Sequence, residues 1–527
     1  MEQYLEQRTQ LINEDRARRV DSHLFNLQGD STAARADAIV RDIRKFEADS
    51  IWSQDYEDID HVYPGMEFLT ARHIIEKTKL FELLCKMPKG ALLHAHLDAM
   101  VNVNVLLRLA LEHPELHVKV ETALTSSSIS SVLPQFRALA PAEIAAASET
   151  SLSSENYDNS WVQLAKARET FDPALGGPEA FDKWIMGALT INPTEAYKTH
   201  STVPKIWKKF SSTFLVSTGL IRFAPVWPRY IREFLLSSVD DGISYVEARI
   251  NFVYKFMVGA DGQENIPHRQ WLVDFEKVLS DVKDELKQQG REDEFFGARI
   301  IYTTIRYVSP EELNWYLEDC IQLKKEFPHL IAGFDLVGDE NALKPLTDYL
   351  PQLLAFQERT KELGLDIPFI LHAGETLGDG SKADMNLYDA ILLGTKRIGH
   401  GFSLVKHPRL MEICREKQIA LEVCPISNEI LRLTSSMPMH PFPTLLNHGV
   451  PVALCSDDPA VFGSMGLSYD FFQVLVSSEV TGILTLGEIA RKSIEYTTLE
   501  PAEKQRALAQ WQARWDKFLA EIAQIQT

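Results

Sequence analysis

The stretch MPKGALLHAHLDAM, residues 87–100, ends an apolar run with two histidines one residue apart. On a β-strand, residues i and i+2 face the same side, so the imidazoles of His94 and His96 can reach a single metal ion. A carboxylate, Asp98, follows at once. Such a pair often arises by chance in a chain with 15 histidines, so it indicates a metal site only if other parts of the chain supply further ligands.

Seven more short apolar runs follow this stretch and alternate with helical patterns. The eight runs are residues 91–97, 243–250, 298–305, 330–338, 368–375, 396–402, 419–427 and 451–458. Near-continuous apolar runs are typical of parallel strands that helices cover on both faces. Eight β/α units predict an α/β fold, a (β/α)8 TIM barrel of the metal-dependent hydrolase type, with its site at the carboxyl ends of the strands.

The spacing of the runs predicts how the chain is divided. The barrel is expected over residues 81–527, and the gap of about 150 residues between its first two strands predicts an insertion at about residues 100–200. Residues 1–80 are polar, with a helix expected behind a cap at Asp30 or Ser31. The apolar stripe of that helix consists of Ile39, Val40, Ile43 and Phe46. This extension either packs on its own barrel or forms a dimerisation arm.

Two helix signals lie near the carboxyl end of the chain. Thr485 and Glu488 have the T-x-x-E spacing of a capping box and predict the start of a helix. Further on, apolar residues recur at helical spacing, which predicts core packing. These residues are Leu508, Trp511, Trp515, Phe518 and Ile522.

Composition excludes some classes of function. The net charge of −20 at pH 7 would repel phosphates, so we expect neither nucleic-acid nor membrane partners. The charged N-terminal residues do not resemble a signal peptide, and no uncharged stretch is long enough to span a membrane. The five cysteines form no C-x-x-C pair and are expected to be mostly buried free thiols. With no glycosylation acceptor present, we expect a cytoplasmic protein.

Ionisable residues gather where the predicted strands end. The fifth run ends with His372 and Glu375, the sixth with His400, and the eighth with Asp457 and Asp458. Taken singly, the histidine could be structural and the aspartates could cap a helix. Together at one barrel mouth, these groups would cost too much free energy to bury without a compensating metal or substrate.

The fourth run ends with Asp335, Gly338, Asp339 and Glu340. Asp339 and Glu340 are expected to cap a helix. Neither is therefore expected to take part in the site.

Three imidazoles and a carboxylate are ligands that suit zinc and leave a position open for water. The expected ligands are His94, His96, His372 and Asp457, holding one Zn²⁺ per chain. Zinc lowers the pKa of bound water to near ~7 and so makes a nucleophile at neutral pH. Glu375 and His400 lie close by in the sequence and are expected to move protons.

Five motifs occur in a fixed order along the chain: H-x-H-L-D-A, H-A-G-E-T, R-I-G-H-G, C-P-x-S-N and S-D-D-P. In this order they resemble the adenosine deaminase family, and more closely its adenosine deaminase-related growth factor branch, the extracellular-type adenosine deaminases. The resemblance extends over most of residues 80–520, including IAGFDLVGDE and GLSYDFF. It implies the same four zinc ligands.

The resemblance also implies a role for each catalytic residue. His400 would orient and deprotonate the water held by zinc, and Glu375 would donate a proton to N1 of the purine. Asp458 would hold N7, and the backbone N–H of Gly338 would hold N3. The acid Asp98 matches a ribose-contacting residue of the classical enzymes, although the growth-factor branch usually has its acid where this chain has Leu97.

Trp207, which precedes Phe210 and Phe214 on one helical pattern, resembles a substrate-side tryptophan of the growth-factor branch. A core tryptophan is an equal alternative. The branch is typically secreted and has a disulfide in its inserted domain, and the sequence shows neither a signal peptide nor a cysteine in the insertion.

The reaction implied is hydrolytic deamination of adenosine, and of 2′-deoxyadenosine, at C6. The products are inosine or 2′-deoxyinosine, and ammonia. A broader adenine-nucleotide or other purine deaminase is the alternative within enzymes. A growth-factor-like binding protein with weak catalysis is the alternative outside them. The other zinc deaminase design, H-x-E with P-C-x-x-C, is absent from this sequence. By resemblance we also expect a homodimer built through the N-terminal extension.

Overall fold

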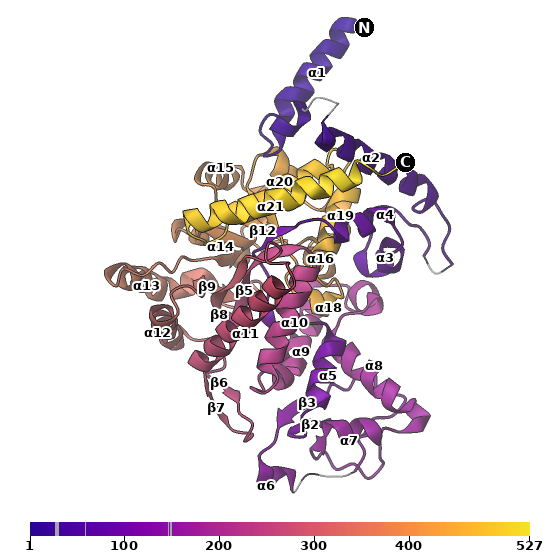
Figure 1. Cartoon of the computed structure of the whole chain (residues 1–527). Helices are drawn as coiled ribbons and strands as arrows, with labels where there is room; N and C mark the ends of the chain where they lie inside the picture. The colour runs from indigo at the N-terminus through magenta and orange to yellow at the C-terminus, as the bar shows by residue number, and fades with distance from the viewer. Residues whose placement is uncertain (27–30, 58, 146, 148–149, 527) are drawn as a thin grey trace.

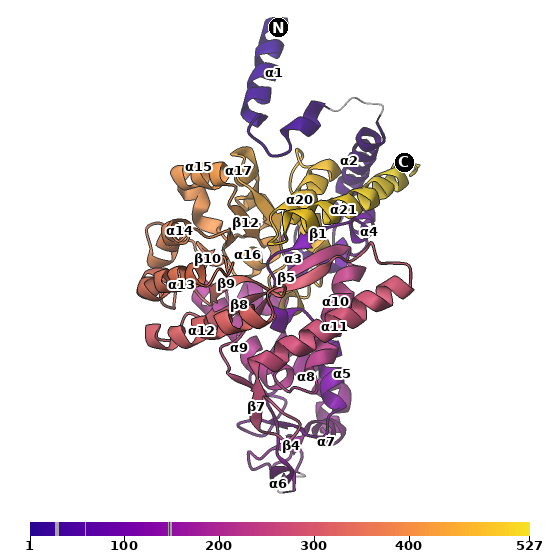
Figure 2. The same cartoon turned by 60° about the vertical axis from the view of Figure 1, so that its left-hand side comes forward.

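Two parallel β-sheets lie at the centre of the molecule (Figures 1 and 2). The computed structural model describes residues 1–26, 31–57, 59–145, 147 and 150–526. One sheet has the strand order β1-β5-β8-β9 and the other the order β10-β11-β12-β13. The strands are β1 Gly90–Leu92, β5 Ile243–Asn251, β8 Gly297–Ile305, β9 Ile331–Val337, β10 Leu371–Ala373, β11 Arg397–His400, β12 Ala420–Val423 and β13 Val452–Leu454. Each of the eight predicted runs overlaps one of them, so the predicted parallel α/β fold is confirmed.

Isolated parallel bridges link the two sheets at both edges. Phe334 in β9 pairs with Phe369 just before β10, and Ala95 beyond β1 pairs with Asp457 beyond β13. The second link joins the backbones of two predicted site segments: His96 N donates to Asp457 O, and Asp457 N donates to His94 O, each at 3.1 Å. The carboxyl ends of β1 and β13 are thereby held side by side.

Helices follow the strands and cover the sheets. From β5 onward they are α11 His268–Gln288, α12 Pro310–Glu326, α13 Leu350–Glu362, α14 Lys382–Leu392, α15 Pro408–Lys417, α16 Pro425–Ile430, α17 Phe442–Asn447, α18 Pro459–Phe462, α19 Ser468–Val476, α20 Ile483–Glu495 and α21 Pro501–Ile522. The predicted stripe on α21 packs as core, with the Trp511 and Trp515 rings stacked at 5.4 Å. Four of the five free cysteines are buried. Among the described residues, no helix combines the length and apolarity needed to cross a membrane.

The segment between β1 and β5 forms the lower end of the molecule in Figures 1 and 2. It contains an antiparallel sheet of order β3-β2-β4 and a set of helices. Their bounds are α5 Val103–Leu111, β2 Leu116–Lys119, β3 Gln135–Ala138, α6 Pro141–Ile144, β4 Val162–Gln163, α7 Leu164–Glu169, α8 Gly177–Leu189, α9 Val203–Ile221 and α10 Trp227–Asp240. A separate hairpin of β6 Phe256–Val258 and β7 Glu264–Pro267 follows β5. The predicted position of the insertion falls within this segment.

The N-terminal region contains α1 Glu2–Arg16, α2 Thr32–Ser50, α3 Phe68–Ile75 and α4 Lys79–Cys85. Ser31 caps α2 as predicted, because its Oγ accepts a hydrogen bond from the Ala34 N–H at 3.1 Å, while Asp30 lies outside the described residues. Ile39 and Val40 are buried, but Phe46 is wrong as a member of the buried stripe, since it is 70% exposed. It lies on the solvent side of a helix whose opposite side contacts α20 and α21.

The capping box predicted at Thr485 is wrong. The helix α20 begins earlier, at Ile483, with Gly482 as its N-cap. Thr485 instead donates its hydroxyl to Asp21 Oδ2 at 2.8 Å. This bond, with that of Arg19 Nη1 to Asn447 Oδ1 at 2.8 Å, anchors the chain that follows α1 to the body of the molecule.

Candidate metal and catalytic centre

Four imidazoles meet at the carboxyl ends of the strands. His94 and His96 follow β1, His372 lies in β10, and His400 ends β11. The ring centroid of His94 lies 4.6 Å from that of His372 and 4.6 Å from that of His400, and 5.4 Å from that of His96. Residues more than 300 positions apart in the sequence, His94 and His400, are therefore brought into one cluster.

Asp457 completes this cluster from the end of β13. Its Oδ1 lies 3.2 Å from His94 Nε2 and 3.3 Å from His96 Nε2. In the described structure, that Oδ1 and His94 Nε2 are both buried without a hydrogen-bond partner. Since an unpartnered buried polar atom is costly, these two atoms fit the ligand shell of a cation.

The backbone is strained at the same place. His400 has φ of 61° and Asp457 has φ of 58°, the left-handed region that residues other than glycine seldom adopt. Strain of this kind persists where the surrounding structure fixes a side chain for function.

The predicted ligands come together in overlapping sets of three. Ligand atoms lie within 4.8 Å of one another in the set His94, His96 and Asp457, and in the set His94, His372 and His400. A third set consists of Glu375, His400 and Asp457. All four residues predicted as ligands therefore belong to the cluster, although no single set contains all four.

Two buried carboxylates fix the orientation of the imidazoles. His94 Nδ1 lies 2.8 Å from Glu422 Oε2, and His372 Nδ1 lies 2.6 Å from Asp335 Oδ2. Because the carboxylates accept hydrogen bonds at Nδ1, each ring keeps Nε2 free for a metal. Burial also lowers the pKa of His372 to about 3, which keeps that ring in the neutral form that metals bind.

A guanidinium joins these two carboxylates. Arg249, in β5, lies 2.8 Å from Asp335 through Nε and 2.8 Å from Glu422 through Nη2. Burial acts to raise the pKa of Glu422, but Arg249, Arg397 and His94 together outweigh it and hold that pKa well below its usual range. Arg397 adds a second contact to Glu422 at 2.6 Å. The metal-facing histidines are thus supported by a continuous buried ion network.

The net charge of this network and Asp457 matches a divalent cation. Its three carboxylates are Glu247, Asp335 and Glu422, and its two guanidiniums are Arg249 and Arg397. One negative charge remains, and Asp457 adds a second, because the surrounding imidazoles, His400 first, outweigh burial and hold its pKa well below the usual range. A divalent cation would neutralise both, so the donor set and the charge fit Zn²⁺.

Glu375 lies beside the cluster in surroundings that favour its protonated form. Burial, together with the nearby Asp457 and Glu340, raises its pKa well above the usual range. Its Oε1 lies 3.6 Å from His400 Nε2. A buried carboxyl group that is neutral at pH 7 can serve as a general acid.

The prediction that Glu340 caps a helix is wrong. Its carboxylate is buried and accepts hydrogen bonds from the backbone of Glu375 at 2.9 Å and from Asn386 Nδ2 at 2.6 Å. Arg306 lies 3.3 Å away. Glu340 therefore fixes the loop that carries Glu375.

Asp458 and Asp98 lie close to each other near the cluster. Burial, Asp457 and then Asp98 raise the pKa of Asp458 well above its usual range. Burial also raises the pKa of Asp98, which lies in a short 3-10 turn, Leu97–Ala99. Asp458 thus favours its protonated form, which can donate a hydrogen bond.

Trp207 lies on α9 and is 7% exposed. Its indole Nε1 is buried without a partner among the described residues. The neighbouring Phe210 stacks on Phe462 of α18, with centroids 5.7 Å apart, four residues beyond Asp458. Most of the Trp207 side chain is thus packed as core. Its unpartnered indole N–H is the part that could contact a substrate.

Gly338 directly follows β9 and has φ of 109°. A Cβ at this position would lie 2.7 Å from Leu343 Cδ1. Glycine is therefore required here by both conformation and space, and its backbone stands at the same strand ends as the cluster.

Sequence reasoning missed the ion network beneath the histidines. Arg249, Asp335 and Glu422 all lie inside apolar strand runs, where a charged residue is rarely buried without a partner. That signal was available in the sequence. Asn428, which contacts His400, ends the C-P-x-S-N motif, whereas His440, which contacts Asn428, left no comparable signal.

Comparison with known proteins gives consistent matches. The family model described as adenosine deaminase matches residues 188–513. Adenosine deaminase 2-A of Danio rerio is 35% identical over 87% of this chain and 85% of its own length. Adenosine deaminase 2 of Homo sapiens is 33% identical over 87% of this chain and 84% of its own.

Solved structures share the fold. An amidohydrolase from Burkholderia ambifaria, crystallised with bound zinc, superposes with a TM-score of 0.52 and 17% identity, covering 88% of this chain and 98% of its own. At this identity the likeness concerns the fold alone.

Proposed function

The chain belongs to the adenosine deaminase family of zinc-dependent aminohydrolases, and we propose that it converts adenosine and 2′-deoxyadenosine to inosine nucleosides and ammonia. The observation that carries this proposal is the buried Glu375, whose pKa is raised well above its usual range, beside the imidazoles that Asp335 and Glu422 orient. We also propose that the two sheets act as one (β/α)8 barrel, which the bridges at both sheet edges support.

One zinc ion per chain would be held by His94, His96, His372 and Asp457. When bound, zinc supplies a hydroxide-like nucleophile at neutral pH. His400 would orient that nucleophile toward C6 of the purine, since its Nε2 lies 3.8 Å from Asp457 Oδ2.

The other side chains would bind and polarise the base. Glu375 would donate its proton to purine N1, which draws electron density away from C6. Purine N7 is a hydrogen-bond acceptor. Because the pKa of Asp458 is raised, its carboxyl group favours the protonated form that can donate to N7. The Gly338 N–H would donate to N3. Asp98, beside Asp458, would contact the ribose, and Trp207 would donate its free indole N–H to the substrate.

An adenine-nucleotide or other purine deaminase is the second candidate, because solved structures of the same fold include an adenine deaminase from Arthrobacter aurescens. If Asp98 faces the ribose, a 5′-phosphate would bring negative charge toward a carboxyl group. That arrangement favours a nucleoside.

The proposal is tested by following the loss of the adenine chromophore with adenosine, 2′-deoxyadenosine, AMP and adenine. We expect turnover of the two nucleosides at a kcat/KM at least about tenfold above that of the others, a difference of about 1.4 kcal/mol in transition-state binding. Faster turnover of AMP would favour the nucleotide alternative. No turnover of any purine by a zinc-loaded protein would favour a binding protein with weak catalysis.

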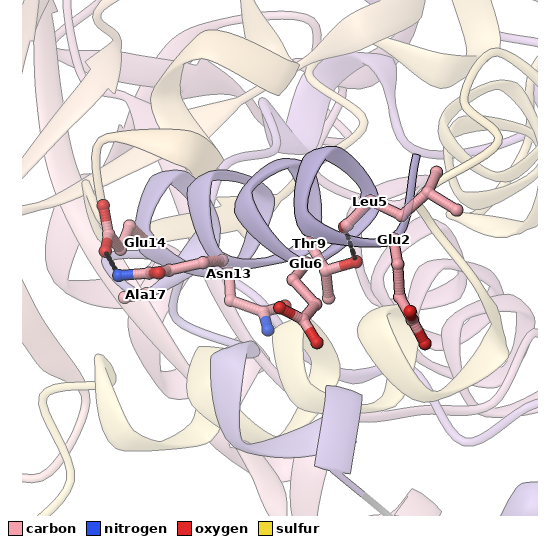
Figure 3. Close-up of a pocket in the computed structure, with 8 residues that line it drawn as sticks. Glu2, Leu5, Glu6, Thr9, Asn13, Glu14 and Ala17 are labelled. Atoms are coloured by element: carbon pink, nitrogen blue, oxygen red, sulfur yellow. Dashed lines mark hydrogen bonds between the residues drawn. The ribbon is translucent and has the colours of Figure 1, made fainter.

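We further propose that the chain forms a homodimer through α1. This helix extends away from the rest of the molecule (Figures 1 and 2) and buries none of its residues. Tyr4, Leu5 and Leu11 are each more than half exposed. One open face of the helix is formed by α1 residues and Ala17. Figure 3 shows this face, on which Thr9 donates to Leu5 O within the helix. Because α1 buries none of its residues, the face is open to a second copy.

A further inference from the structure

A chain of hydrogen bonds runs from the backbone of α17 to His400. The Phe442 N–H donates to His440 Nδ1 at 3.0 Å. His440 Nε2 lies 3.0 Å from Asn428 Oδ1, and Asn428 Nδ2 lies 3.2 Å from His400 Nδ1. All three side chains are buried, with exposures of 1% to 3%. No part of the reaction proposed above uses Asn428 or His440.

The backbone N–H at one end fixes the direction of every bond in this chain. A backbone N–H can only donate, so His440 Nδ1 is an acceptor and the neutral ring carries its proton on Nε2. The amide atom of Asn428 that faces this proton must then be the oxygen. The other atom is the NH₂ group, which can only donate, so His400 Nδ1 is an acceptor.

We propose that His440 and Asn428 are positioning residues that hold His400 in the tautomer with its proton on Nε2, so that it faces the reaction site as a hydrogen-bond donor. Which ring nitrogen carries the proton is set by the bond that the other nitrogen makes. His400 Nε2 points to the site, 3.6 Å from Glu375 Oε1 and 3.8 Å from Asp457 Oδ2.

The surroundings of His440 support a fixed, neutral ring. Burial lowers its pKa to about 3, and its ring packs against the rings of Phe402 and Phe442 with centroids 5.4 and 6.5 Å away. A second proton on His440 would also place an N–H against the Phe442 N–H. His440 therefore accepts from the Phe442 N–H and donates to Asn428 Oδ1 across the neutral pH range.

This inference deepens the proposed function and rests on it. A ring that already carries its proton on Nε2 can accept no further proton there. The expected role of deprotonating the nucleophile is thus replaced by one of orienting it through a fixed N–H donor. Removing a fixed donor near the developing charge costs rate rather than substrate affinity.

The test replaces Asn428 by aspartate, which has the same shape but no donor. A carboxylate facing His400 Nδ1 would favour the opposite tautomer. In the zinc-loaded Asn428→Asp protein we expect kcat to fall on the order of 10²–10⁴-fold, with KM changed little and zinc content unchanged. A lost zinc ion together with lost activity would instead mean a structural role and would overturn the proposal.

The tautomer itself is read by nitrogen NMR of histidine-labelled protein without substrate, with the His400 signals assigned by their loss in His400→Gln. We expect an unprotonated Nδ1 in the wild type and a protonated Nδ1 in Asn428→Asp. A protonated Nδ1 in the wild type would overturn the proposal. If the wild type shows the expected tautomer but deaminates no purine, the proposed function fails and the positioning roles stand.

A second pair of variants keeps the test valid if Asn428→Asp does not fold. His440→Gln preserves a donor to Asn428 and an acceptor for the Phe442 N–H, so most of kcat should remain. His440→Leu removes both and frees the amide to rotate, which should cost about 10- to 100-fold in kcat. Equal kcat values in two folded, zinc-loaded variants would overturn the proposal.

Discussion

The cluster of ionisable residues at the strand ends, called the centre below, buries charged side chains, whereas helix α1 exposes apolar ones. At the centre, carboxylates, guanidiniums and imidazoles are buried, and almost every polar atom has a partner within the same chain. Helix α1 buries nothing and presents Tyr4, Leu5 and Leu11 to solvent. Two partnerless atoms of the centre, His94 Nε2 and Asp457 Oδ1, lie 3.2 Å apart.

The centre can therefore be explained within one chain, whereas the exposed face of α1 is explained by the proposed second copy. One small cation would satisfy the unpartnered atoms of His94 and Asp457. In the proposed dimer, a second copy of the chain would cover the exposed apolar side chains of α1. Changes at the centre should therefore act on chemistry, and changes at α1 should act on assembly.

The largest effect is expected for Glu375→Gln. Glutamine keeps the shape of the side chain but is a far poorer proton donor, so kcat should fall on the order of 10²–10⁴-fold while zinc and fold are retained. The matched control is Glu358→Gln, an exposed position on α13, which should leave kcat unchanged. If Glu375→Gln kept more than about a tenth of kcat, Glu375 would not be the general acid.

A smaller effect is expected for Arg249→Met, which removes the cation between Asp335 and Glu422. The carboxylates then repel each other and hold His94 and His372 less firmly, so zinc affinity measured by chelator competition should fall about 10- to 100-fold. Arg249→Lys restores one positive charge without the two-armed contact and should recover part of the loss. Unchanged zinc affinity in a folded Arg249→Met protein would show that the network does not support the metal site.

Glu429, in α16, contacts α3 and the segment between β1 and β5, and its effect is smaller again. It is buried, and its Oε2 accepts from the Phe68 N–H and from the Tyr197 hydroxyl, each at 3.1 Å. Burial raises its pKa from the usual 4.5 to about 8. Between these values the folded state holds one more proton than the unfolded state, so the free energy of unfolding falls as pH rises, by roughly 1.4 kcal/mol per pH unit.

Glu429→Gln cannot ionise and should lose this dependence. Thermal unfolding of both proteins, measured from about pH 5 to about pH 8 in steps of about half a unit, checks this expectation. The advantage of the glutamine variant should grow steadily with pH. Parallel curves for the two proteins would mean that Glu429 is ionised in the folded state.

The smallest effect on chemistry is expected when α1 is removed. Deleting residues 1–17 takes away no buried side chain, so zinc content and kcat should not change. Light scattering should show a dimer for the full chain and a monomer for the truncated one. A full-length monomer at micromolar concentration would contradict the role given to α1.

Much of the fold and the centre could be predicted because the signals are local. Each strand run is apolar and short, and several end in ionisable residues, so the sequence alone places His94, His372, Glu375 and Asp457 at one edge of the strands. The parallel topology follows from the same pattern.

The rest depends on contacts between distant segments, which a single sequence does not show. Glu340 looks like a helix cap locally, yet it binds the loop of Glu375. Thr485 has capping-box spacing, yet its hydroxyl donates a hydrogen bond to Asp21. The tautomer of His400 depends on His440, forty residues away, and only the hydrogen-bond chain through Asn428 shows it.

The central claim is that the buried cluster is a zinc site that deaminates adenosine. The most direct measurement is zinc content and adenosine turnover, determined together on the wild type and on His94→Ala. We expect one zinc per chain and equal amounts of inosine and ammonia from the wild type, and loss of most zinc and all measurable turnover in the folded variant. Stoichiometric zinc in His94→Ala, or a zinc-loaded wild type without adenosine turnover, would contradict the account.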